Sequence, residues 1–484
     1  MSKQTTINSR RGFIKSGALA AAGFMIVPRY VLGGKGFVAP SDKLVVAGIG
    51  AGGKGSSDIA YVHGSGNAEI GFLCDVDDRS AAKTVEKFPK AKYYKDWRKL
   101  FDKEHKHIDA VTVSTPDHNH ANIALTAMQL HKHVYVQKPL THDIYEARVL
   151  TGAARKYKVV TQMGNQGASG DGVRQLMEWY NAGLIGDVQT VYCWTDRPVW
   201  PQGIAWSKTK AEVPKELDWD LWLGTAPYKD YVDKLVPFNW RGWWDYGTGA
   251  LGDMGCHLME PAFRVLDLSY VKDVQSSVGT FYKDIFQRAS YPESCPPSSH
   301  ITLTFPKTAK TQGDVTVHWM DGGIRPERPA ELGDNETFGD GGNGVLFIGT
   351  KGKMVAGTYG MFPKLLPTSR MTEVNVPQTI KRVPGGDNGH YAQWVEACLA
   401  GYGKMEVSSP FETAGPLTEA LLMANLSIRG HDIERAKADG KGVDYPGRDI
   451  KLLWDNINMK VTNFDEVNQF VRRKYRQGWE VSGL

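Results

Sequence analysis

One short stretch restricts the fold of this chain more than any other. It is LVVAGIG, residues 44–50, and further glycines follow at once. A short apolar run of this kind is typical of a buried parallel strand. Gly50, Gly52 and Gly55 then have the spacing G-x-G-x-x-G, in which glycine allows a tight turn, close approach of a pyrophosphate and close packing of helix on strand. The stretch therefore predicts a dinucleotide site whose phosphates face a helix N-terminus.

A second strand supports this interpretation. AEIGFLCDVD, residues 68–77, is apolar and reaches an acidic residue, Asp75, 20 positions after Gly55. A carboxylate there can accept hydrogen bonds from a ribose diol and repels a 2′-phosphate. This favours NAD over NADP, although Arg79 nearby leaves NADP open.

Strands and helices continue to alternate up to residue 163. IDAVTVSTP (108–116) and KHVYVQKPL (132–140) have strand character, and HANIALTAMQLH (120–131) has helical spacing. Alternation of this kind predicts a doubly wound parallel sheet, here over residues 41–163. Ligands bind such sheets at the carboxyl ends of the strands, where this chain places Pro116, Asp117, His118, Gln137 and Lys138.

A candidate acid–base pair lies in GALGDMGCHLMEP, residues 249–261. Asp253 and His257 are four positions apart and would share one face of a helix. Histidine titrates near neutrality and suits removal of a hydroxyl proton, and a nearby carboxylate can orient it. This pair has two alternative interpretations: an ordinary pair on a helix surface, and a metal site that also uses Glu260. Pro261 should interrupt the helix.

The segment 194–246 is unusually rich in tryptophan. Eight of the 14 tryptophans lie between residues 194 and 244. Aromatic faces can stack on the apolar faces of sugars, whereas a long loop can also use them for a small core of its own. Trp240, Arg241, Trp243 and Trp244 directly precede the acid–base segment, so we predict that they contact substrate.

These motifs together resemble those of the Gfo/Idh/MocA family of sugar oxidoreductases. The resemblance is carried by GIGAGGKG, CDVD, VSTPDHNHA, KHVYVQKPL and GALGDMGCHLMEP, from about residue 43 to residue 265. It implies an α/β fold: a Rossmann-type doubly wound parallel sheet, then a C-terminal α/β domain, residues 164–415, with a large open, mostly antiparallel sheet. It also implies homo-oligomers, dimers or tetramers, formed through that sheet.

Patterns in the second half agree with such a sheet. ITLTFPK (301–307) and GDVTVHWMDGG (313–323) are predicted antiparallel strands, and NGVLFIGTKGKMVAG (343–357) a hairpin. Residues 416–484 are predicted to be a mostly helical segment packed back on the body.

The resemblance also assigns site residues. Lys138, Asp253 and His257 match the catalytic positions, but Gln137 stands where the family usually has glutamate, so Lys138 lacks a carboxylate neighbour in sequence. His118 and His120 match residues near the cofactor or at a helix cap rather than metal ligands. His390 matches a histidine at the edge of the site, with a helix cap or core role as the alternative. The predicted cofactor contacts are Gly50, Gly52, Gly53, Lys54, Gly55, Asp75, Thr115, Pro116, His118, His120, Gln137, Lys138 and Gln166. The predicted substrate contacts are Lys138, Asn165, Trp240, Arg241, Trp243, Trp244, Asp253, His257 and His390.

The N-terminus has the features of an export signal. Arg10-Arg11-Gly12-Phe13 precedes a short apolar run. This pattern resembles the twin-arginine signal of proteins that are exported in the folded state, so we predict a signal over residues 1–35 and a periplasmic protein.

The charge of the remaining chain is close to balanced. Residues 1–35 hold six basic and no acidic residues. Removing those six from the 58 Lys and Arg leaves 52 against 53 Asp and Glu, so charge gives no support to nucleic-acid or membrane binding.

The cysteines indicate neither disulfides nor zinc. There are five of them, an odd number, widely spaced and without a C-x-x-C motif. Buried thiols are the expected outcome. We predict no bound metal.

Three functions fit the sequence. The first is NAD(H)-dependent oxidoreduction of a secondary hydroxyl of a sugar or glycoside, with a tightly held cofactor that is regenerated within each turnover, because an exported enzyme has no ready supply. The second is a redox-neutral NAD-dependent glycosidase that oxidises C3, eliminates, hydrates and reduces. The third is an inactive sugar-binding or regulatory relative, which the joint presence of Lys138, Asp253 and His257 disfavours.

Overall fold

The computed structural model describes residues 42–372 and 374–484. The predicted export signal, residues 1–35, lies outside the described residues. Leu44–Leu484 forms one compact unit, to which the description below is confined. No helix in the described part of the chain is long and apolar enough to cross a membrane.

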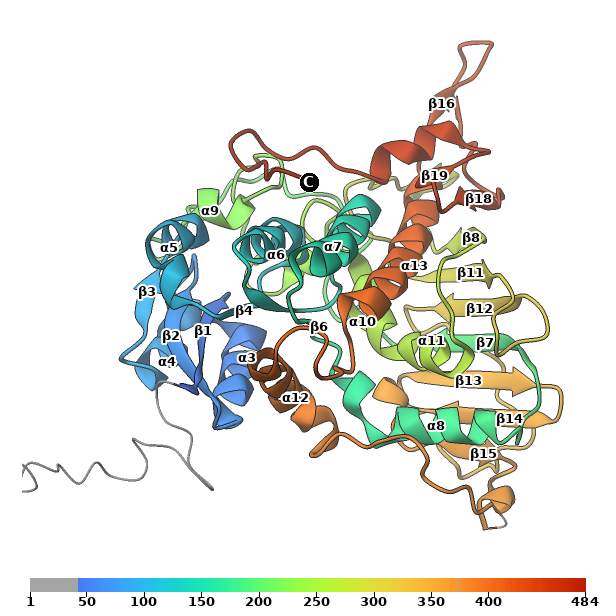
Figure 1. The fold of residues 1–484 in the computed structure, drawn as a ribbon. Helices are drawn as coiled ribbons and strands as arrows, with labels where there is room; N and C mark the ends of the chain where they lie inside the picture. The colour runs from blue at the N-terminus through green and yellow to red at the C-terminus, as the bar shows by residue number, and fades with distance from the viewer. Residues whose placement is uncertain (1–41, 373) are drawn as a thin grey trace, which may run out of the picture. The chain divides into compact units, whose positions relative to one another are not determined.

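The first half of the unit is the predicted doubly wound domain (Figure 1). Its six strands are all parallel and lie in the order β3-β2-β1-β4-β5-β6. The strands are β1 (Leu44–Ile49), β2 (Ala68–Cys74), β3 (Lys92–Tyr94), β4 (Ala110–Val113), β5 (His133–Val136) and β6 (Thr161–Met163). The helices between them are α3 (Gly53–Gly64), α4 (Asp78–Lys87), α5 (Trp97–Glu104), α6 (His120–Gln129) and α7 (Ile144–Tyr157). The strand order reverses at β1, which places a crevice between the ends of β1 and β4.

The second half is built on one large sheet, also as predicted. Its nine strands lie in the order β15-β14-β13-β7-β12-β11-β8-β18-β19, and β7 with β12 is the one parallel pair. They are β7 (Val188–Trp194), β8 (Asp273–Val278), β11 (Ser299–Phe305), β12 (Val315–Met320), β13 (Gly344–Gly349), β14 (Gly352–Ala356), β15 (Lys364–Leu366), β18 (Leu452–Asp455) and β19 (Lys460–Val461). The predicted strand pair 301–307 and 313–323 corresponds to β11 and β12, and the predicted hairpin to β13 and β14.

Helices cover one face of this sheet (Figure 1). They are α8 (Asp171–Asn181), α10 (Gly249–Leu258), α11 (Glu260–Leu266) and α13 (Phe411–Gly430). In β11 the buried Ile301, Leu303 and Phe305 alternate with half-buried polar residues, because successive side chains of a strand point to opposite faces. The helix is interrupted at Met259, between α10 and α11, and Pro261 lies in the first turn of α11, which agrees with the expected interruption. A further helix, α12 (Gly386–Ala400), packs against α3 of the first domain.

The tryptophan-rich segment has little regular structure and largely packs on itself. It contains α9 (Trp219–Leu223) and a 3₁₀ turn, Asn239–Gly242. Trp219, Trp222, Trp240 and Trp243 share a small core with Tyr246. Most of its tryptophans are therefore structural.

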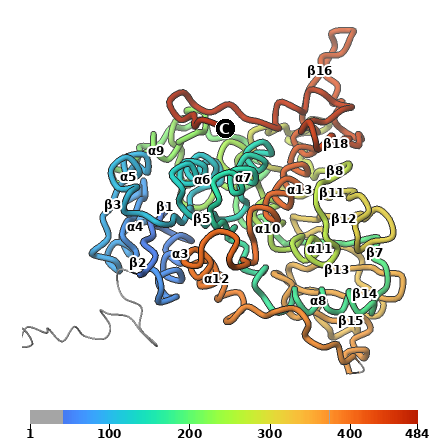
Figure 2. The backbone as a smooth tube through the Cα atoms, in the orientation of Figure 1, coloured from blue at the N-terminus to red at the C-terminus, as the bar shows by residue number. Residues whose placement is uncertain are grey.

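The C-terminal segment differs from its prediction. Residues 416–484 are helical only as far as Gly430, where α13 ends. Short strands follow, β16 (Arg435–Ala436), β17 (Val443–Asp444), β18 and β19, then a 3₁₀ helix, Asp465–Phe470. The tail after residue 470 does pack back on the body, and Figure 2 shows it crossing above α7 and α6 toward α9. A second small hairpin consists of β9 (Tyr282–Asp284) and β10 (Gln287–Arg288).

Candidate active site

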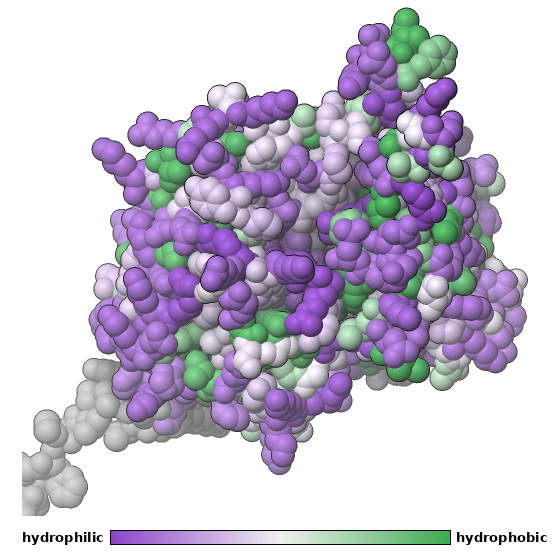
Figure 3. Space-filling model, turned by 90° about the horizontal axis from the view of Figure 1, so that it is seen from above, coloured by the Kyte–Doolittle hydropathy of each residue, from purple (hydrophilic) through white to green (hydrophobic). Residues whose placement is uncertain are grey.

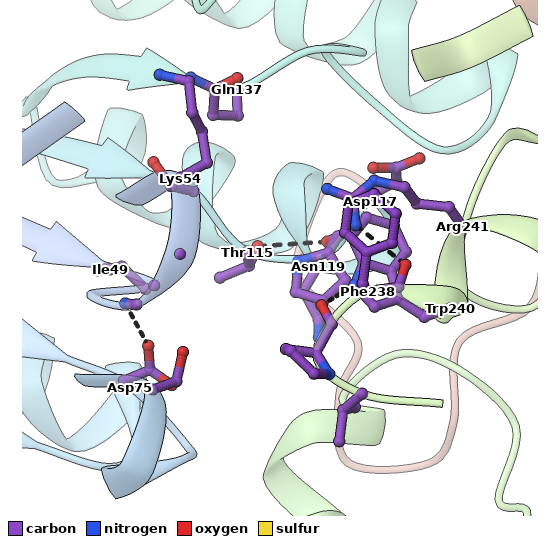
Figure 4. A pocket seen from close by; sticks show the side chains of 18 of the residues that line it. Ile49, Lys54, Asp75, Thr115, Asp117, Asn119, Gln137, Phe238, Trp240 and Arg241 are labelled. Carbon is purple, nitrogen blue, oxygen red and sulfur yellow. Dashed lines mark hydrogen bonds between the residues drawn. The ribbon is translucent and has the colours of Figure 1, made fainter. Parts of the chain in front are cut away.

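A cavity of about 660 Å³ lies at the carboxyl ends of the parallel strands. The glycine loop and Asp75 form one end of it, and α10 and the tryptophan-rich segment form the other. Figure 4 shows Asp75 at one side and Phe238, Trp240 and Arg241 gathered at the opposite side. The cavity is long enough to join a cofactor site to a substrate site.

The glycine loop has the backbone that the motif predicts. Gly50 has φ +80°, and a Cβ there would lie 2.4 Å from the carbonyl oxygen of Ser114. A Cβ on Gly55 would lie 1.7 Å from the carbonyl oxygen of Gly50, so only glycine lets α3 pack this closely on the loop. A Cβ on Gly53, at φ +51°, would meet nothing within 4 Å. The loop therefore leaves open space at the N-terminus of α3, where a phosphate is favoured.

Asp75 faces the cavity from the end of β2. Its two carboxylate oxygens accept hydrogen bonds from the backbone N–H groups of Gly52 (2.8 Å) and Asp77 (2.9 Å). Burial raises the pKa of Asp75 to about 6, against the lowering effect of these bonds. Arg79 does not line the cavity, because its guanidinium binds both oxygens of Asp77. The cation that could have favoured a 2′-phosphate is thus engaged elsewhere.

Lys138 reaches the second domain. Its ammonium donates to the backbone oxygen and to Oδ1 of Asp253, both at 2.8 Å. Arg241 lies 3.5 Å from the same Oδ1 and is flanked by the rings of Phe238 and Trp240, each 4.4 Å away. Burial alone would raise the pKa of Asp253, but Lys138 and Arg241 outweigh it and lower the pKa. The carboxylate missing at Gln137 is thus supplied to Lys138 by Asp253.

His257 lies one turn after Asp253 on α10 and faces the same cavity. Its Nδ1 is 2.9 Å from Oδ1 of Asn165. An amide oxygen only accepts, so Nδ1 carries the proton and Nε2 keeps a free lone pair. Burial lowers the pKa of His257 well below its ordinary value, with Lys138 adding to the effect. The imidazole is therefore neutral at neutral pH and can act as a base.

The partner that orients His257 differs from the expected one. Asp253 was expected to orient it, but the carboxylate is engaged by Lys138 and Arg241. Asn165 holds the ring instead, and the ring of Tyr359 packs edge-on against it at 4.5 Å. Glu260, the third member of the alternative metal site, pairs with Arg264. No group of His, Cys, Asp and Glu in residues 42–372 and 374–484 is arranged to hold a metal ion.

The structure brings most predicted site residues to this cavity. Those that line it are Gly50, Gly52, Gly53, Lys54, Asp75, Thr115, Pro116, Gln137, Lys138, Gln166, Trp240, Arg241, Asp253 and His257. Gly55 lies just behind the loop, and Asn165 lies behind His257.

Five predicted contacts do not reach the cavity wall. His118 is buried, with Nδ1 3.2 Å from the carbonyl oxygen of Tyr246, and His120 lies between the carbonyl oxygens of Pro139 (2.9 Å) and Thr115 (2.8 Å). His390 is a core group, bonded to Ser169 (2.7 Å) and to the carbonyl oxygen of Met163 (2.9 Å). Trp243 and Trp244 are buried in hydrophobic cores. These five side chains hold the walls in place in this structure, and none of them faces the cavity.

Other lining residues were not among the predicted contacts, although Asp117 was expected at a strand end on this side of the sheet. Tyr359 arrives from the loop after β14, and Asp117, Asn119 and Phe238 complete the end near Arg241. Asp117 and Asn119 stand in the DHNH motif beside the predicted histidines, so their positions carried a signal. Tyr359 and Phe238 lie in segments without any motif, and only the fold brings them here. All five cysteines are free and buried.

Comparison with known proteins identifies the class of both domains. Residues 44–165 match the Gfo/Idh/MocA oxidoreductase family's NAD-binding Rossmann fold, and residues 179–285 match the C-terminal α/β domain of that family. Two segments of this chain, residues 44–165 and 179–285, therefore match the NAD-binding domain and the C-terminal domain of that family.

Individual relatives are distant. A glucose-6-phosphate 3-dehydrogenase of Bacillus subtilis is 28% identical over 236 residues, 49% of this chain and 57% of the relative. A glycosyl hydrolase family 109 protein of Shewanella pealeana is 28% identical over 204 residues, 37% of this chain and 44% of the relative. The chain matches about half the length of these curated relatives. A levoglucosan dehydrogenase solved with NADH and levoglucosan has a TM-score of 0.53 at 14% identity, covering 79% of this chain and 97% of that one, which shows a shared fold.

The residues present fit NAD. The open space at Gly53 admits a phosphate, and Asp75 faces the cavity with the carboxylate that a ribose diol needs. Lys138, His257 and Gln166 line the far end. The cofactor of this domain is NAD, and the position of Asp75 suits the adenosine end of it.

The pKa of Asp75 gives a testable consequence for NAD binding. Ribose hydroxyls donate to the ionised carboxylate, so affinity for NAD should fall as pH drops below about 6, by up to about tenfold for each pH unit. Titration of NADH fluorescence at a series of pH values measures this. Asp75→Asn should bind more weakly with a flat pH dependence, and a flat dependence in the wild type would contradict the assignment.

Proposed function

We propose that this chain is an NAD(H)-dependent oxidoreductase that acts on a secondary hydroxyl of a sugar or glycoside. The observation that carries the proposal is the joint position of Lys138, Asp253 and His257 at the end of the cavity away from Asp75. A neutral imidazole with a free Nε2 and an ammonium held by a carboxylate are the base and the cation that alcohol oxidation needs. The sugar dehydrogenases among the relatives support the substrate class.

The chemistry assigns each side chain a role. The substrate hydroxyl gives its proton to Nε2 of His257, and Lys138 stabilises the negative charge that develops on the oxygen. Bound NAD supplies the acceptor for the hydride that leaves the carbinol carbon, which becomes a ketone carbon. Asn165 keeps the proton of His257 on Nδ1, and Asp253 holds the ammonium of Lys138 in place.

The wall opposite Asp75 suits a polyol. The exposed ring of Phe238 offers an aromatic surface beside the buried Trp240, and Arg241 and Asn119 offer donors and acceptors for hydroxyl groups. Apolar faces with a few polar groups at their edges are the general pattern of a small-ligand site. A bound sugar would place its ring against this wall.

Net glycoside cleavage is the second candidate. The relative of Shewanella pealeana named as a glycosyl hydrolase family 109 protein favours it. In that route C3 is oxidised, the leaving group is eliminated from C1 as the C2 proton is removed, water adds, and C3 is reduced again. The cofactor ends as it began, which suits an enzyme without a cofactor supply. An inactive sugar-binding relative remains the third candidate, and the intact base and lysine disfavour it.

Export and assembly belong to the same proposal. Residues 1–35 resemble a twin-arginine signal, which supports a periplasmic enzyme loaded with NAD before export. A cofactor enclosed in an exported protein cannot be readily exchanged, so we infer that it is held tightly and regenerated in each turnover. The resemblance to the family supports a homo-oligomer formed through the large sheet.

The first test uses protein purified from the periplasm. Its nicotinamide content is measured, and sugars and glycosides are then offered without added cofactor. We expect bound NAD(H) and many turnovers per cofactor, with either an oxidised and a reduced product or a cleaved glycoside. An empty protein that works only with added NAD would leave a simple dehydrogenase and contradict recycling. A loaded protein that converts no sugar or glycoside would contradict the proposed substrate class.

A further inference from the structure

The side chain of Lys54, in the glycine loop, does not point toward the open space at Gly53 where the phosphates are expected. Its ammonium forms an ion pair with Asp58, one turn later on α3, and donates to the hydroxyl of Tyr391 on α12 at 2.8 Å. That hydroxyl also accepts a hydrogen bond from the amide of Gln166 at 2.8 Å. The side chain is thus held along α3 and away from Asp75, and Figure 4 shows it beside Gln137.

Asp58 holds this arrangement together, because its carboxylate contacts four other side chains. Its side chain has no exposed surface. It accepts from Tyr391 (2.7 Å), from Ser114 at the end of β4 (2.8 Å) and from Gln137 at the end of β5 (2.8 Å), besides Lys54. The ammonium of Lys54 is therefore held near the ends of β4 and β5.

This side of the sheet is the nicotinamide half. A doubly wound fold binds the two halves of a dinucleotide on either side of its switch point. Asp75, at the end of β2, marks the adenosine half. The ends of β4 and β5, with Lys138 next to Gln137, mark the other half.

The cavity faces the positive end of the Lys54–Asp58 pair. The side chain of Lys54 is 46% exposed and lines the cavity, whereas Asp58 is enclosed. The other charged groups that line the cavity beyond the adenosine end are Lys138, Arg197, Arg241, Asp253 and the buried Asp117, and His257 is neutral. Arg197 is paired with Asp196 at 3.0 Å. The field of Lys54 also reaches His257, whose pKa it helps to lower after burial and Lys138.

We propose that Lys54 selects the redox state of the cofactor, by placing a second cation beside Lys138 in the nicotinamide half. The oxidised nicotinamide ring carries a positive charge and the reduced ring carries none, so a cation there favours NADH over NAD⁺. The proposal rests on cofactor binding alone and goes beyond the sugar chemistry. It gives the site a driving force for taking hydride from substrate and a reason to retain the reduced cofactor.

The test compares two substitutions in the touching pair. Purified protein is equilibrated with known mixtures of NAD⁺ and NADH, and the bound ratio is quantified after removal of free nucleotide. Lys54→Met should lower the preference for NADH about tenfold, the change that ~1.4 kcal/mol of charge interaction produces. Asp58→Asn keeps the cation and removes its counter-charge, so it should raise that preference severalfold.

Lys95→Met is the matched control. Lys95 also lines the cavity, but at the adenosine end, where it pairs with Asp78 at 2.9 Å. Its loss should leave the bound ratio unchanged.

Each outcome of this test leads to a different conclusion about Lys54. Opposite shifts for Lys54→Met and Asp58→Asn support the proposal, because structural damage would not change sign between two residues in contact. Equal loss of both nucleotides in Lys54→Met would make Lys54 a phosphate contact and overturn it, as would shifts in the same direction. A wild type that binds neither nucleotide would contradict cofactor use itself, whereas binding with an unmoved ratio contradicts the role of Lys54 alone.

Discussion

Replacing His257 with asparagine is expected to lower kcat by about 10³-fold, within the 10²- to 10⁴-fold range usual for a general base. The free Nε2 is the group of the site suited to take the hydroxyl proton, since the ammonium of Lys138 is engaged by Asp253. NADH affinity should stay within a few-fold of wild type, because the glycine loop and Asp75 are untouched. Steady-state kinetics on the substrate found in the panel, with NADH titration alongside, measures both effects.

Two comparisons sharpen that experiment. Asn165→Ala removes the acceptor that fixes the proton on Nδ1, so kcat should fall by less than in His257→Asn. Because burial keeps the pKa of His257 well below its ordinary value, kcat at saturating cofactor should show no acid limb near pH 6.5. An unchanged kcat in His257→Asn would remove the assigned base, and an acid limb near pH 6.5 would contradict its neutral state.

Local patterns were enough to predict the first domain and half of the site. The apolar run before Gly50 and the acidic end of β2 each depend on neighbours in sequence. The structure confirms the parallel sheet, and the family match confirms an NAD-binding domain. Lys138 could be placed because it follows a strand and precedes Pro139. A residue at the end of a strand can be placed in the site from the sequence, because the end of the strand determines its position.

Partners that are distant in sequence could not be predicted. Asn165 and His257 are 92 residues apart, and Asp58 and Tyr391 are 333 apart. The sequence placed Asp253 beside His257 by helical spacing, but Lys138 from the other domain takes that carboxylate. Trp243 and Trp244 were assigned to substrate because of their position before α10, and burial in the core explains the same residues.

The C-terminal segment shows the same limit. Its composition suggested helix beyond residue 430, yet Leu452–Asp455 adds to the edge of the large sheet beside β8. A free sheet edge offers unpaired N–H and C=O groups, and the tertiary contact overrides the local preference. Beyond that strand the tail lies on a face where mostly polar side chains are exposed (Figure 3).

One residue of that tail holds several elements near the site together. The guanidinium of Arg473 donates to Glu146 at 2.7 Å and to the carbonyl oxygen of His118 at 2.6 Å, and the hydroxyl of Tyr475 donates to Glu146 at 2.6 Å. Glu146 belongs to the capping box of α7 with Asp143. Through His118 the tail contacts the loop that carries Asp117 and Asn119 to the cavity.

Arg473→Met is therefore expected to destabilise the protein by about 3–5 kcal/mol, because it leaves the buried Glu146 without its cation. The melting temperature should fall by roughly 5 °C or more in a chain of this size. Limited proteolysis should cut the tail beyond Val471 faster than in the wild type, and NADH affinity should fall as the loop at His118 loosens. Differential scanning calorimetry and a timed digest measure these effects.

Arg472→Met supplies the matched control, one residue away. Arg472 is exposed and stacks on the ring of Tyr145 at 4.0 Å, so its loss should cost within about 1 kcal/mol. A large gap between the two variants follows from the buried carboxylate of Glu146, which Arg473 pairs with and Arg472 does not, since both variants remove one positive charge from the same stretch of tail. If both variants melt together with the wild type, the tail does not brace the site, and the loop at Asp117 and Asn119 must be held by Thr248 and the tryptophan-rich segment instead.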